Sequence, residues 1–228
     1  FYKFKNSFFA MIDKTKWGLI GYGKFGKKIE DSFNQTNVSQ LYSIASRSFE
    51  NIEKNSQELP KNKHLFHNYN ELIKQKDIDN IYISTTNNLH KDLIISSAQN
   101  KKNIICEKPA CLNEFDFSEC IKEIKKNNVF FMEGLMYLHH PQITKSIELV
   151  KSGDIGKIKK IVASFGYRVG KKLFFFELKK IDTKSRLFNP ALGGGAIYDL
   201  GCYPLTAVLL FFYLKKNNNK IKKYNFKR

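Results

Sequence analysis

The sequence predicts an α/β protein in which a parallel, doubly wound sheet is followed by an incomplete second α/β domain with an antiparallel sheet. Three observations carry this expectation. An apolar strand runs into a glycine-rich turn and an amphipathic helix near the start of the chain. Strand and helix signals then alternate up to residue 133, and the pattern changes beyond it. We therefore expect two domains, at 14–133 and 134–228.

The opening unit has the sequence pattern of a dinucleotide-binding turn. The apolar run 17–20 meets G-x-G-x-x-G, and apolar residues recur at helical spacing after it. In such a turn Gly21 permits the tight bend, Gly23 lets the backbone approach a pyrophosphate, and Gly26 lets helix and strand pack closely. An ordinary strand-to-helix loop that happens to hold three glycines is the competing interpretation. The cofactor-binding residues expected here are Gly21, Gly23, Lys24, Phe25 and Gly26.

Five more strands are expected in the first domain, at 41–45, 64–66, 80–85, 103–106 and 129–132. The run 80–85 is almost uninterrupted in its apolar character, as expected for a strand with both faces covered. Helices are expected at 70–76, at 89–98 and after Asn113, which can cap a helix with Asp116 at its third position.

The second half of the chain has a different pattern. Pro141 begins a helix that Gly153 can terminate. Residues 158–167 alternate imperfectly and are expected to form a long strand, whereas 171–187 is ambiguous. The glycine triplet 193–195 opens the last helix.

The composition indicates a globular chain, with 42% apolar and 26% charged residues. The longest apolar run, 207–214, is far shorter than the roughly 18 residues needed to span a bilayer. The four cysteines form no C-x-x-C pair and have no histidine at zinc spacing. Reduced thiols in a cytoplasmic protein, with no metal site and no membrane partner, are the simple expectation.

The formal net charge of +18 would suit nucleic acid or an anionic surface. However, the lysines are spread over the whole length and are mixed with Asn, Ile and Phe. That distribution indicates a compositional bias and solvated faces, and no nucleic-acid motif of the usual kinds is present. We therefore expect no nucleic-acid partner.

Three motifs occur in order along the chain. They are the glycine turn, Glu107-Lys108-Pro109 after the strand 103–106, and GGGAIYDLGCYP at 193–204. Together they resemble the Gfo/Idh/MocA oxidoreductases, and MEGLMYLHHP at 132–141 resembles the branch that contains dihydrodiol and D-xylose dehydrogenases. The resemblance implies a Rossmann domain for a nicotinamide cofactor and a small sugar or diol substrate. Members of this family usually continue beyond the last helix seen here, so we expect a C-terminally truncated chain whose second-domain sheet lacks most of its strands.

The resemblance also implies the catalytic residues. In such enzymes the lysine of the E-K-P segment sits beside the nicotinamide and the substrate hydroxyl, which assigns that role to Lys108. A tyrosine or histidine four residues after the motif aspartate transfers the proton, which assigns Tyr203, with Asp199 as the motif aspartate. A phenol with an ordinary pKa of about 10 is a poor base at neutral pH, so a nearby cation such as Lys108 would favour the phenolate. Alternatively, Asp199 is a helix residue whose carboxylate bonds to the backbone or to Lys108.

Cofactor choice depends on Ser46-Arg47-Ser48 at the end of the second strand. An acidic residue there would bind the ribose 2′-hydroxyl of NAD, but the chain has none, and Glu50 lies further on. Arg47 can pair with a 2′-phosphate and both serines can hydrogen-bond it, which favours NADP over NAD; a plain surface arginine is the alternative. Further residues expected around the cofactor are Thr85, Asn87, Asn88 and His90 on the nicotinamide-ribose side, and Glu107 and Lys108. His90 by itself is more typical of a helix start than of a catalyst.

Two classes of function follow from these residues. The leading interpretation is a cytoplasmic NADP-dependent oxidoreductase that acts on a sugar or cyclic diol, compatible with a homo-oligomer formed through the second-domain sheet. The alternative is a non-catalytic nucleotide-binding relative that keeps the Rossmann half only. A basic nucleic-acid-binding domain is a third and weaker interpretation.

Overall fold

The structure is a computed structural model that describes residues 14–47, 49, 63–167, 171–173, 176–179 and 185–216. The chain divides into two compact units, Phe1–Gly134 and Leu135–Arg228. Each unit is described by itself.

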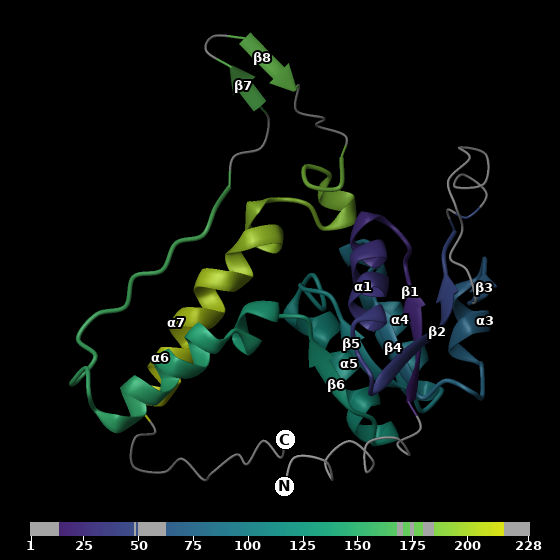
Figure 1. Cartoon of the computed structure of the whole chain (residues 1–228), viewed down its shortest axis with the longest axis horizontal. Helices are drawn as coiled ribbons and strands as arrows, with labels where there is room; N and C mark the ends of the chain where they lie inside the picture. The colour runs from purple at the N-terminus through teal and green to yellow at the C-terminus, as the bar shows by residue number, and fades with distance from the viewer. Residues whose placement is uncertain are drawn as a thin grey trace, which may run out of the picture. The chain divides into compact units, whose positions relative to one another are not determined.

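The first unit is built on a six-stranded parallel sheet in the order β3-β2-β1-β4-β5-β6 (Figure 1). The strands are β1 Thr15–Ile20, β2 Ser39–Ala45, β3 His64–Phe66, β4 Asn80–Ile83, β5 Asn103–Cys106 and β6 Phe131–Glu133. The strand order reverses between β1 and β4, and in such sheets the crevice at the carboxyl ends of these strands is where ligands bind. The doubly wound parallel sheet expected from the sequence is confirmed.

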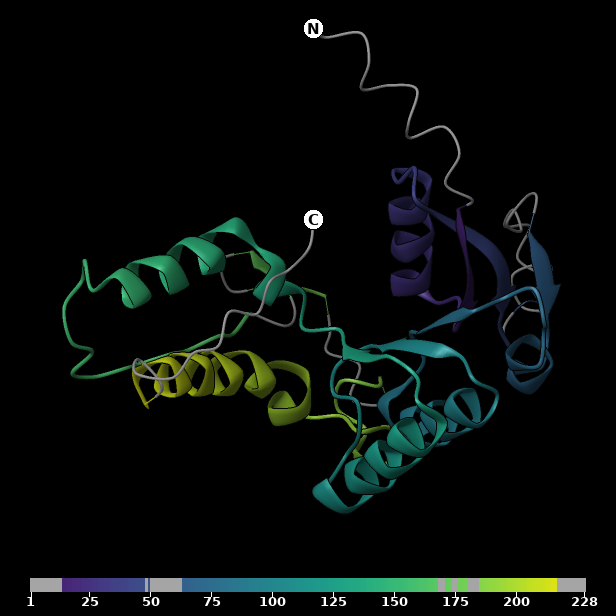
Figure 2. The same cartoon turned by 90° about the horizontal axis from the view of Figure 1, so that it is seen from below.

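Helices cover both faces of this sheet. Successive residues of a strand point to opposite faces, so each strand contributes side chains to both layers. Leu19 belongs to an apolar cluster that packs against α1, and Ile20 belongs to a second cluster with residues of α4 and α5. Figure 2 shows α1 on one side of the sheet and α4 and α5 on the other. The helices of this unit are α1 Lys24–Asn34, α3 Tyr69–Ile73, the 3₁₀ turn η2 Asn87–Leu89, α4 His90–Gln99 and α5 Glu114–Asn127.

Two helix ends expected from the sequence are confirmed. Asn113 caps α5, because its side-chain oxygen accepts the Asp116 backbone N–H at 2.9 Å. In the second unit, helix α6 begins at Pro141 and ends before Gly153, which has a left-handed φ of 83°.

The second unit is mainly helical in its described residues. Its elements are η3 Met136–His139, α6 Pro141–Ser152, β7 Lys171–Leu173, β8 Phe176–Lys179, η4 Pro190–Leu192, the π-helical turn η5 Ile197–Gly201 and α7 Cys202–Lys216. Helices α6 and α7 contact each other, and β7 pairs with β8 in an antiparallel hairpin.

The strand expected at 158–167 is not formed, and this expectation was wrong. These residues run on without helix or strand assignment (Figure 1). A strand is held by hydrogen bonds to a neighbouring strand, and β7 and β8 pair only with each other. Among the described residues, the antiparallel sheet expected in the second domain is therefore reduced to one hairpin.

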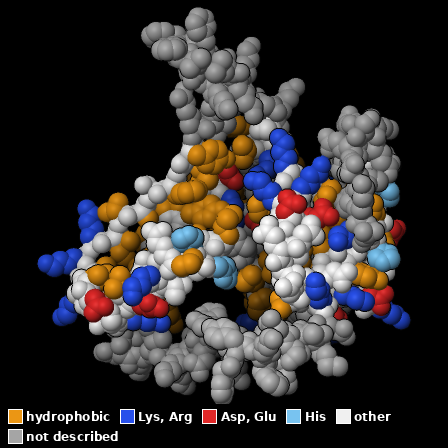
Figure 3. Space-filling model, viewed as in Figure 1, with side chains coloured by type: hydrophobic (Ala, Val, Ile, Leu, Met, Phe, Trp, Pro, Cys, Tyr) orange, Lys and Arg blue, Asp and Glu red, His pale blue; other side chains and the backbone are white. Residues whose placement is uncertain are grey.

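Apolar side chains remain exposed along α7, where Leu205, Leu209 and Phe212 are all more than half exposed. Figure 3 shows such side chains gathered over this helix. A hollow of about 350 Å³ lies in the same unit between α6, residues 155–162 and Phe211. By length and composition alone, Pro190–Leu214 could cross a membrane, which is weak evidence because the core helix of a soluble protein meets the same criteria.

Candidate functional site

The glycine turn between β1 and α1 has a geometry that only glycine fits at two positions. Gly21 has a φ of +95°, and its N–H donates to the Ala45 carbonyl at 2.9 Å. A Cβ atom on Gly26 would lie 2.3 Å from the Gly21 carbonyl oxygen, so helix and turn approach closely here. A Cβ on Gly23 would meet nothing within 4 Å, which leaves open space beside the turn. This is the cradle that a pyrophosphate needs.

Two contacts fix the turn to its surroundings. The Ser84 hydroxyl donates to the Gly21 carbonyl at 2.7 Å, which ties the end of β4 to the turn. The Tyr22 hydroxyl donates to Glu30 in α1 at 2.5 Å, and burial, reinforced by that carboxylate, raises the pKa of Tyr22. The sequence predicted neither contact; Ser84 lies in the expected strand 80–85 and directly follows β4 in the structure.

The amino end of α1 suits an anion. Its N-cap, Gly23, makes no side-chain capping bond, and no acidic residue occupies the first turn. Lys24 is exposed and Phe25 is half-buried at this end of the helix. Helix N–H groups and the helix dipole favour a phosphate in this position.

The end of β2 presents Arg47 to solvent. Ser46 is buried, and its N–H donates to the Phe66 carbonyl of β3 at 2.9 Å. The Arg47 guanidinium carbon lies 5.6 Å from the centre of the Tyr69 ring, within the range of a cation–π contact. Ser48 and Glu50 lie outside the described residues.

A cavity of about 330 Å³ opens next to Arg47, at the carboxyl ends of β2 and β3. This volume is near the lower end of the range for small-ligand sites, about 300–1,000 Å³. Sequence analysis missed most of its lining, because no motif marks it. The lining residues are Arg47, His67, Asn68, Tyr69, Asn70, Leu89, Asp92 and Leu93.

The loop after β4 holds the residues expected on the nicotinamide-ribose side. Thr85 is half-buried, Asn87 is buried in η2 and Asn88 is exposed. Thr86 has φ −72° and ψ 148°, so the backbone is extended where the loop enters η2.

His90 connects this loop to the E-K-P segment. The side chain is fully buried, with Nδ1 2.8 Å from the Pro109 carbonyl oxygen and Nε2 3.3 Å from the Thr85 carbonyl oxygen. Both ring nitrogens thus face backbone oxygens, an arrangement that positions the two loops.

The E-K-P segment follows β5 and is anchored on both sides of Lys108. Glu107 accepts the Tyr82 hydroxyl at 2.5 Å, and burial, followed by the charge of Glu107, raises the pKa of Tyr82. Ala110 donates its N–H to Glu133 at 2.8 Å. Lys108 is half-buried, and the peptide bond that follows it is cis.

Tyr203 and Asp199 lie in an aromatic group of the second unit. Asp199 lies in the π-helical turn and accepts the Tyr167 hydroxyl at 3.1 Å. Tyr203 is half-buried, with its ring centre 4.9 Å from that of Phe165 and 5.9 Å from that of Tyr137. Burial, with a further contribution from Asp199, raises the pKa of Tyr167. Phe165 and Tyr167 were not identified from the sequence, because no motif contains them, whereas Tyr137 lies in the motif at 132–141.

The expected site residues therefore fall into two groups. The glycine turn, Arg47, the loop after β4 and Lys108 belong to the first unit. Asp199 and Tyr203 belong to the second unit.

Comparisons with known proteins agree with this arrangement. The chain is 33% identical over 202 residues to trans-1,2-dihydrobenzene-1,2-diol dehydrogenase of Xenopus tropicalis, a match covering 87% of this chain and 57% of the relative. It is 28% identical over 145 residues to D-xylose 1-dehydrogenase (NADP(+)) of Hypocrea jecorina, covering 64% of this chain and 37% of that protein. The match thus spans little more than half of the first relative and less than half of the second.

Solved structures share the fold. Aldose-aldose oxidoreductase from Caulobacter crescentus, complexed with glycerol, aligns with a TM-score of 0.71 and 25% identity over 90% of this chain and 58% of that one. A 3-ketoreductase from Actinomadura kijaniata, in complex with NADP and TDP-benzene, aligns with a TM-score of 0.72 and 23% identity over 88% and 58%.

Both units also match models of one protein family. The model described as an oxidoreductase family with an NAD-binding Rossmann fold matches residues 15–135. The model of the Gfo/Idh/MocA C-terminal domain matches residues 143–216. The chain therefore belongs to the Gfo/Idh/MocA family of oxidoreductases.

Proposed function

We propose that this chain binds NADP in its first unit and serves an oxidoreductase that transfers a hydride between the nicotinamide and a hydroxyl or carbonyl carbon of a sugar or cyclic diol. The observation that carries the proposal is the glycine cradle between β1 and α1 together with Arg47 at the end of β2. The cofactor supplies the hydride donor or acceptor when it is bound.

The residues of the first unit fit a dinucleotide. The space beside Gly23 accepts the pyrophosphate, and the uncapped amino end of α1 stabilises its negative charge. The cavity beside Arg47 takes the adenosine end, with the Tyr69 ring as one wall. Ser46, Thr85, Asn87, Asn88 and Glu107 complete the set of cofactor-binding residues that we propose.

Arg47 supports NADP as the preferred cofactor. Its exposed guanidinium can form two parallel hydrogen bonds with the 2′-phosphate of NADP. The 2′-hydroxyl of NAD cannot form such a charged, bidentate pair. The D-xylose dehydrogenase relative is named for NADP, which agrees with this choice. Ser48 would add a hydroxyl donor beside it.

Lys108 and Tyr203 are the proposed catalytic residues. Removal of a hydride from an alcohol carbon requires loss of the hydroxyl proton, and the Tyr203 phenol exchanges that proton. The Lys108 ammonium is assigned to the substrate oxygen, where it polarises a carbonyl in the reverse direction. Asp199 holds the Tyr167 hydroxyl in the same unit, which orients the aromatic group around Tyr203.

The names of the relatives support the substrate class. One relative acts on a dihydrobenzene diol, another is a D-xylose dehydrogenase, and a structural neighbour at 25% identity is an aldose-aldose oxidoreductase. All of these substrates present hydroxyl groups on a small carbon skeleton. We propose a small-molecule substrate of this kind for a cytoplasmic protein that binds neither nucleic acid nor membrane.

A second candidate is a nucleotide-binding relative without catalysis. It is favoured by one observation: the described part of the second unit contains a single two-stranded sheet and leaves α7 apolar on its surface. In this case the first unit would bind NADP while no substrate pocket forms.

A binding titration followed by a turnover assay separates these functions. NADPH and NADH are titrated while energy transfer from Trp17, the one tryptophan of the chain, is recorded. NADP⁺ reduction is then measured with D-xylose, other aldoses and a trans-dihydrodiol. Binding with turnover on one of these substrates supports the enzyme, and binding without turnover on all of them supports the second candidate. Absence of binding to either cofactor contradicts both.

A further inference from the structure

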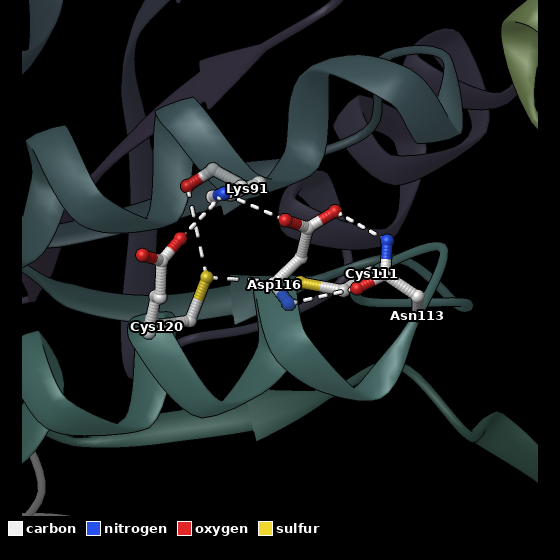
Figure 4. A network of polar contacts seen from close by, with 6 residues as sticks. Lys91, Cys111, Asn113, Asp116 and Cys120 are labelled. Carbon is white, nitrogen blue, oxygen red and sulfur yellow. Dashed lines mark hydrogen bonds and ion pairs between the residues drawn. The ribbon is translucent and has the colours of Figure 1, made fainter.

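Two thiols meet beside the segment that carries Lys108. Cys111 lies three residues after that lysine, and Cys120 lies in the second turn of α5. Their Sγ atoms are 3.6 Å apart, although nine positions separate them in the sequence. Cys120 is buried and Cys111 is half-buried, and their two sulfur atoms face each other (Figure 4).

Lys91 links helix α4 to helix α5 beside these two thiols. Its ammonium group donates to Asp116 at 2.6 Å and contacts Glu119 at 2.5 Å, which clamps the start of α4 to α5 (Figure 4). The Cys120 thiol points at the Lys91 backbone carbonyl oxygen, 3.8 Å away. With its own hydrogen directed there, the Cys120 sulfur accepts the hydrogen of Cys111.

This shared hydrogen bond makes the two thiols unequal. It lowers the pKa of Cys120 and is opposed by burial of that thiol, while the Lys91 charge acts in the same direction as the hydrogen bond. Correspondingly, the same bond and burial raise the pKa of Cys111. The more readily ionised Cys120 sulfur therefore lies in contact with the half-buried Cys111 sulfur, which places a resolving thiol beside an oxidisable one.

We propose that Cys111 and Cys120 form a redox-active dithiol, which hydrogen peroxide converts into an intramolecular disulfide. The Cys120 sulfur attacks hydrogen peroxide and becomes a sulfenic acid, and one water molecule leaves. The Cys111 sulfur then attacks the Cys120 sulfur, an S–S bond forms, and the hydroxyl group leaves with the Cys111 proton as a second water. In total, two thiols and one peroxide give one disulfide and two waters, and a dithiol reductant reverses the oxidation.

The geometry requires only local movement. The sulfur atoms must close from 3.6 Å to about 2.05 Å. Cys111 precedes the cap of α5 and is partly solvent-exposed, so its side chain can supply this shift. The disulfide would tie the segment after Lys108 covalently to α5, and this state does not depend on whether the chain binds NADP.

The other two cysteines serve as internal controls. Cys106 is fully buried in β5, and burial raises its pKa well above the usual thiol range, which makes it unreactive. Cys202 is half-exposed, like Cys111, but it belongs to the second unit.

The test is a thiol count combined with peptide mapping. Reduced protein is treated with hydrogen peroxide, quenched, denatured and titrated with Ellman's reagent. We expect loss of two of the four thiols, a Cys111–Cys120 cross-linked peptide, and full recovery with dithiothreitol. The Cys202→Ser control should still lose two thiols, now of three.

Two single variants make the result decisive. Cys120→Ser should form no cross-linked peptide and should keep its Cys111 and Cys106 thiols under the same treatment, because the sulfur that attacks peroxide is gone. Cys111→Ser should accumulate a dimedone-reactive sulfenic acid at Cys120, because the resolving thiol is gone. A disulfide that maps to another pair, a loss of two thiols in Cys120→Ser, or no thiol loss at peroxide levels that oxidise glutathione would each overturn the proposal.

Discussion

Alanine at Gly26 should damage the fold, whereas alanine at Gly23 should damage only cofactor binding. At position 26 the new Cβ would lie 2.3 Å from the Gly21 carbonyl oxygen and 3.4 Å from the Ser84 hydroxyl. The nearer atom belongs to the backbone of the turn and cannot rotate away. At position 23 the new Cβ would meet nothing within 4 Å.

The magnitudes follow from these contacts. Forcing an extra carbon into a packed site costs about 1–3 kcal/mol. Alanine regains about 0.5–1 kcal/mol over glycine inside a helix, and Gly26 is the third residue of α1. The free energy of unfolding should thus fall by roughly 1–2 kcal/mol in Gly26→Ala. In Gly23→Ala it should stay within about 0.5 kcal/mol of wild type.

Urea unfolding and cofactor titration distinguish the two variants. Gly23→Ala should keep the wild-type urea midpoint and lose NADPH affinity at least about tenfold, because its methyl group occupies the space through which the pyrophosphate approaches. Gly26→Ala should shift the urea midpoint downward, measured by Trp17 fluorescence. Wild-type NADPH affinity in Gly23→Ala, or wild-type stability in Gly26→Ala, would refute the reasoning.

Three further predictions concern single side chains. Tyr203→Phe should lower kcat by roughly 10²–10⁴-fold at unchanged NADPH affinity, and full kcat in a catalytically active protein would remove its assigned role. His90→Phe removes the ring nitrogens that face the Pro109 and Thr85 carbonyl oxygens, one of which accepts a hydrogen bond from a neutral imidazole, so urea unfolding should show a loss of about 1–3 kcal/mol; wild-type stability would contradict a structural role for this contact. The hydrogen bond from Lys91 lowers the pKa of Asp116, so its stabilisation is present above the ordinary aspartate pKa of about 3.9 and is lost as pH falls through the folded-state value. Lys91→Met should therefore lower the melting temperature at neutral pH more than in acid, and an equal decrease at both would disprove the linkage.

Much of the first unit could be predicted from the sequence, because its signals are local. The buried strands read as short apolar runs, and two helix starts carry a local signal, the cap Asn113 of α5 and the glycine Gly23 of α1. Repeated alternation of strands and helices predicts a doubly wound sheet, because short right-handed connections leave few possible strand orders. The strand boundaries shifted by a residue or two, as at β6, which begins at Phe131.

The rest depends on contacts that no local pattern encodes. Residues 158–167 alternate like a strand, but a strand exists only where another strand accepts and donates its hydrogen bonds. The cavity beside Arg47 assembles side chains from four separate segments, so spacing could not reveal it. Likewise, Cys111 and Cys120 are nine positions apart, with no thiol-pair motif between them, and only the fold of the segment before α5 against that helix brings their sulfur atoms together.

The ratio of NADPH to NADH affinity, measured in wild type and in Arg47→Asp, tests the proposed cofactor site most directly. Wild type should prefer NADPH, and Arg47→Asp should weaken NADPH binding by about 1.5–3 kcal/mol, or roughly ten- to hundredfold, because the charge-assisted pair is lost. Lys76→Asp makes the same charge change at an exposed position outside the cavity and should leave the ratio as it is. An unchanged ratio in Arg47→Asp would contradict the assignment of NADP to this site.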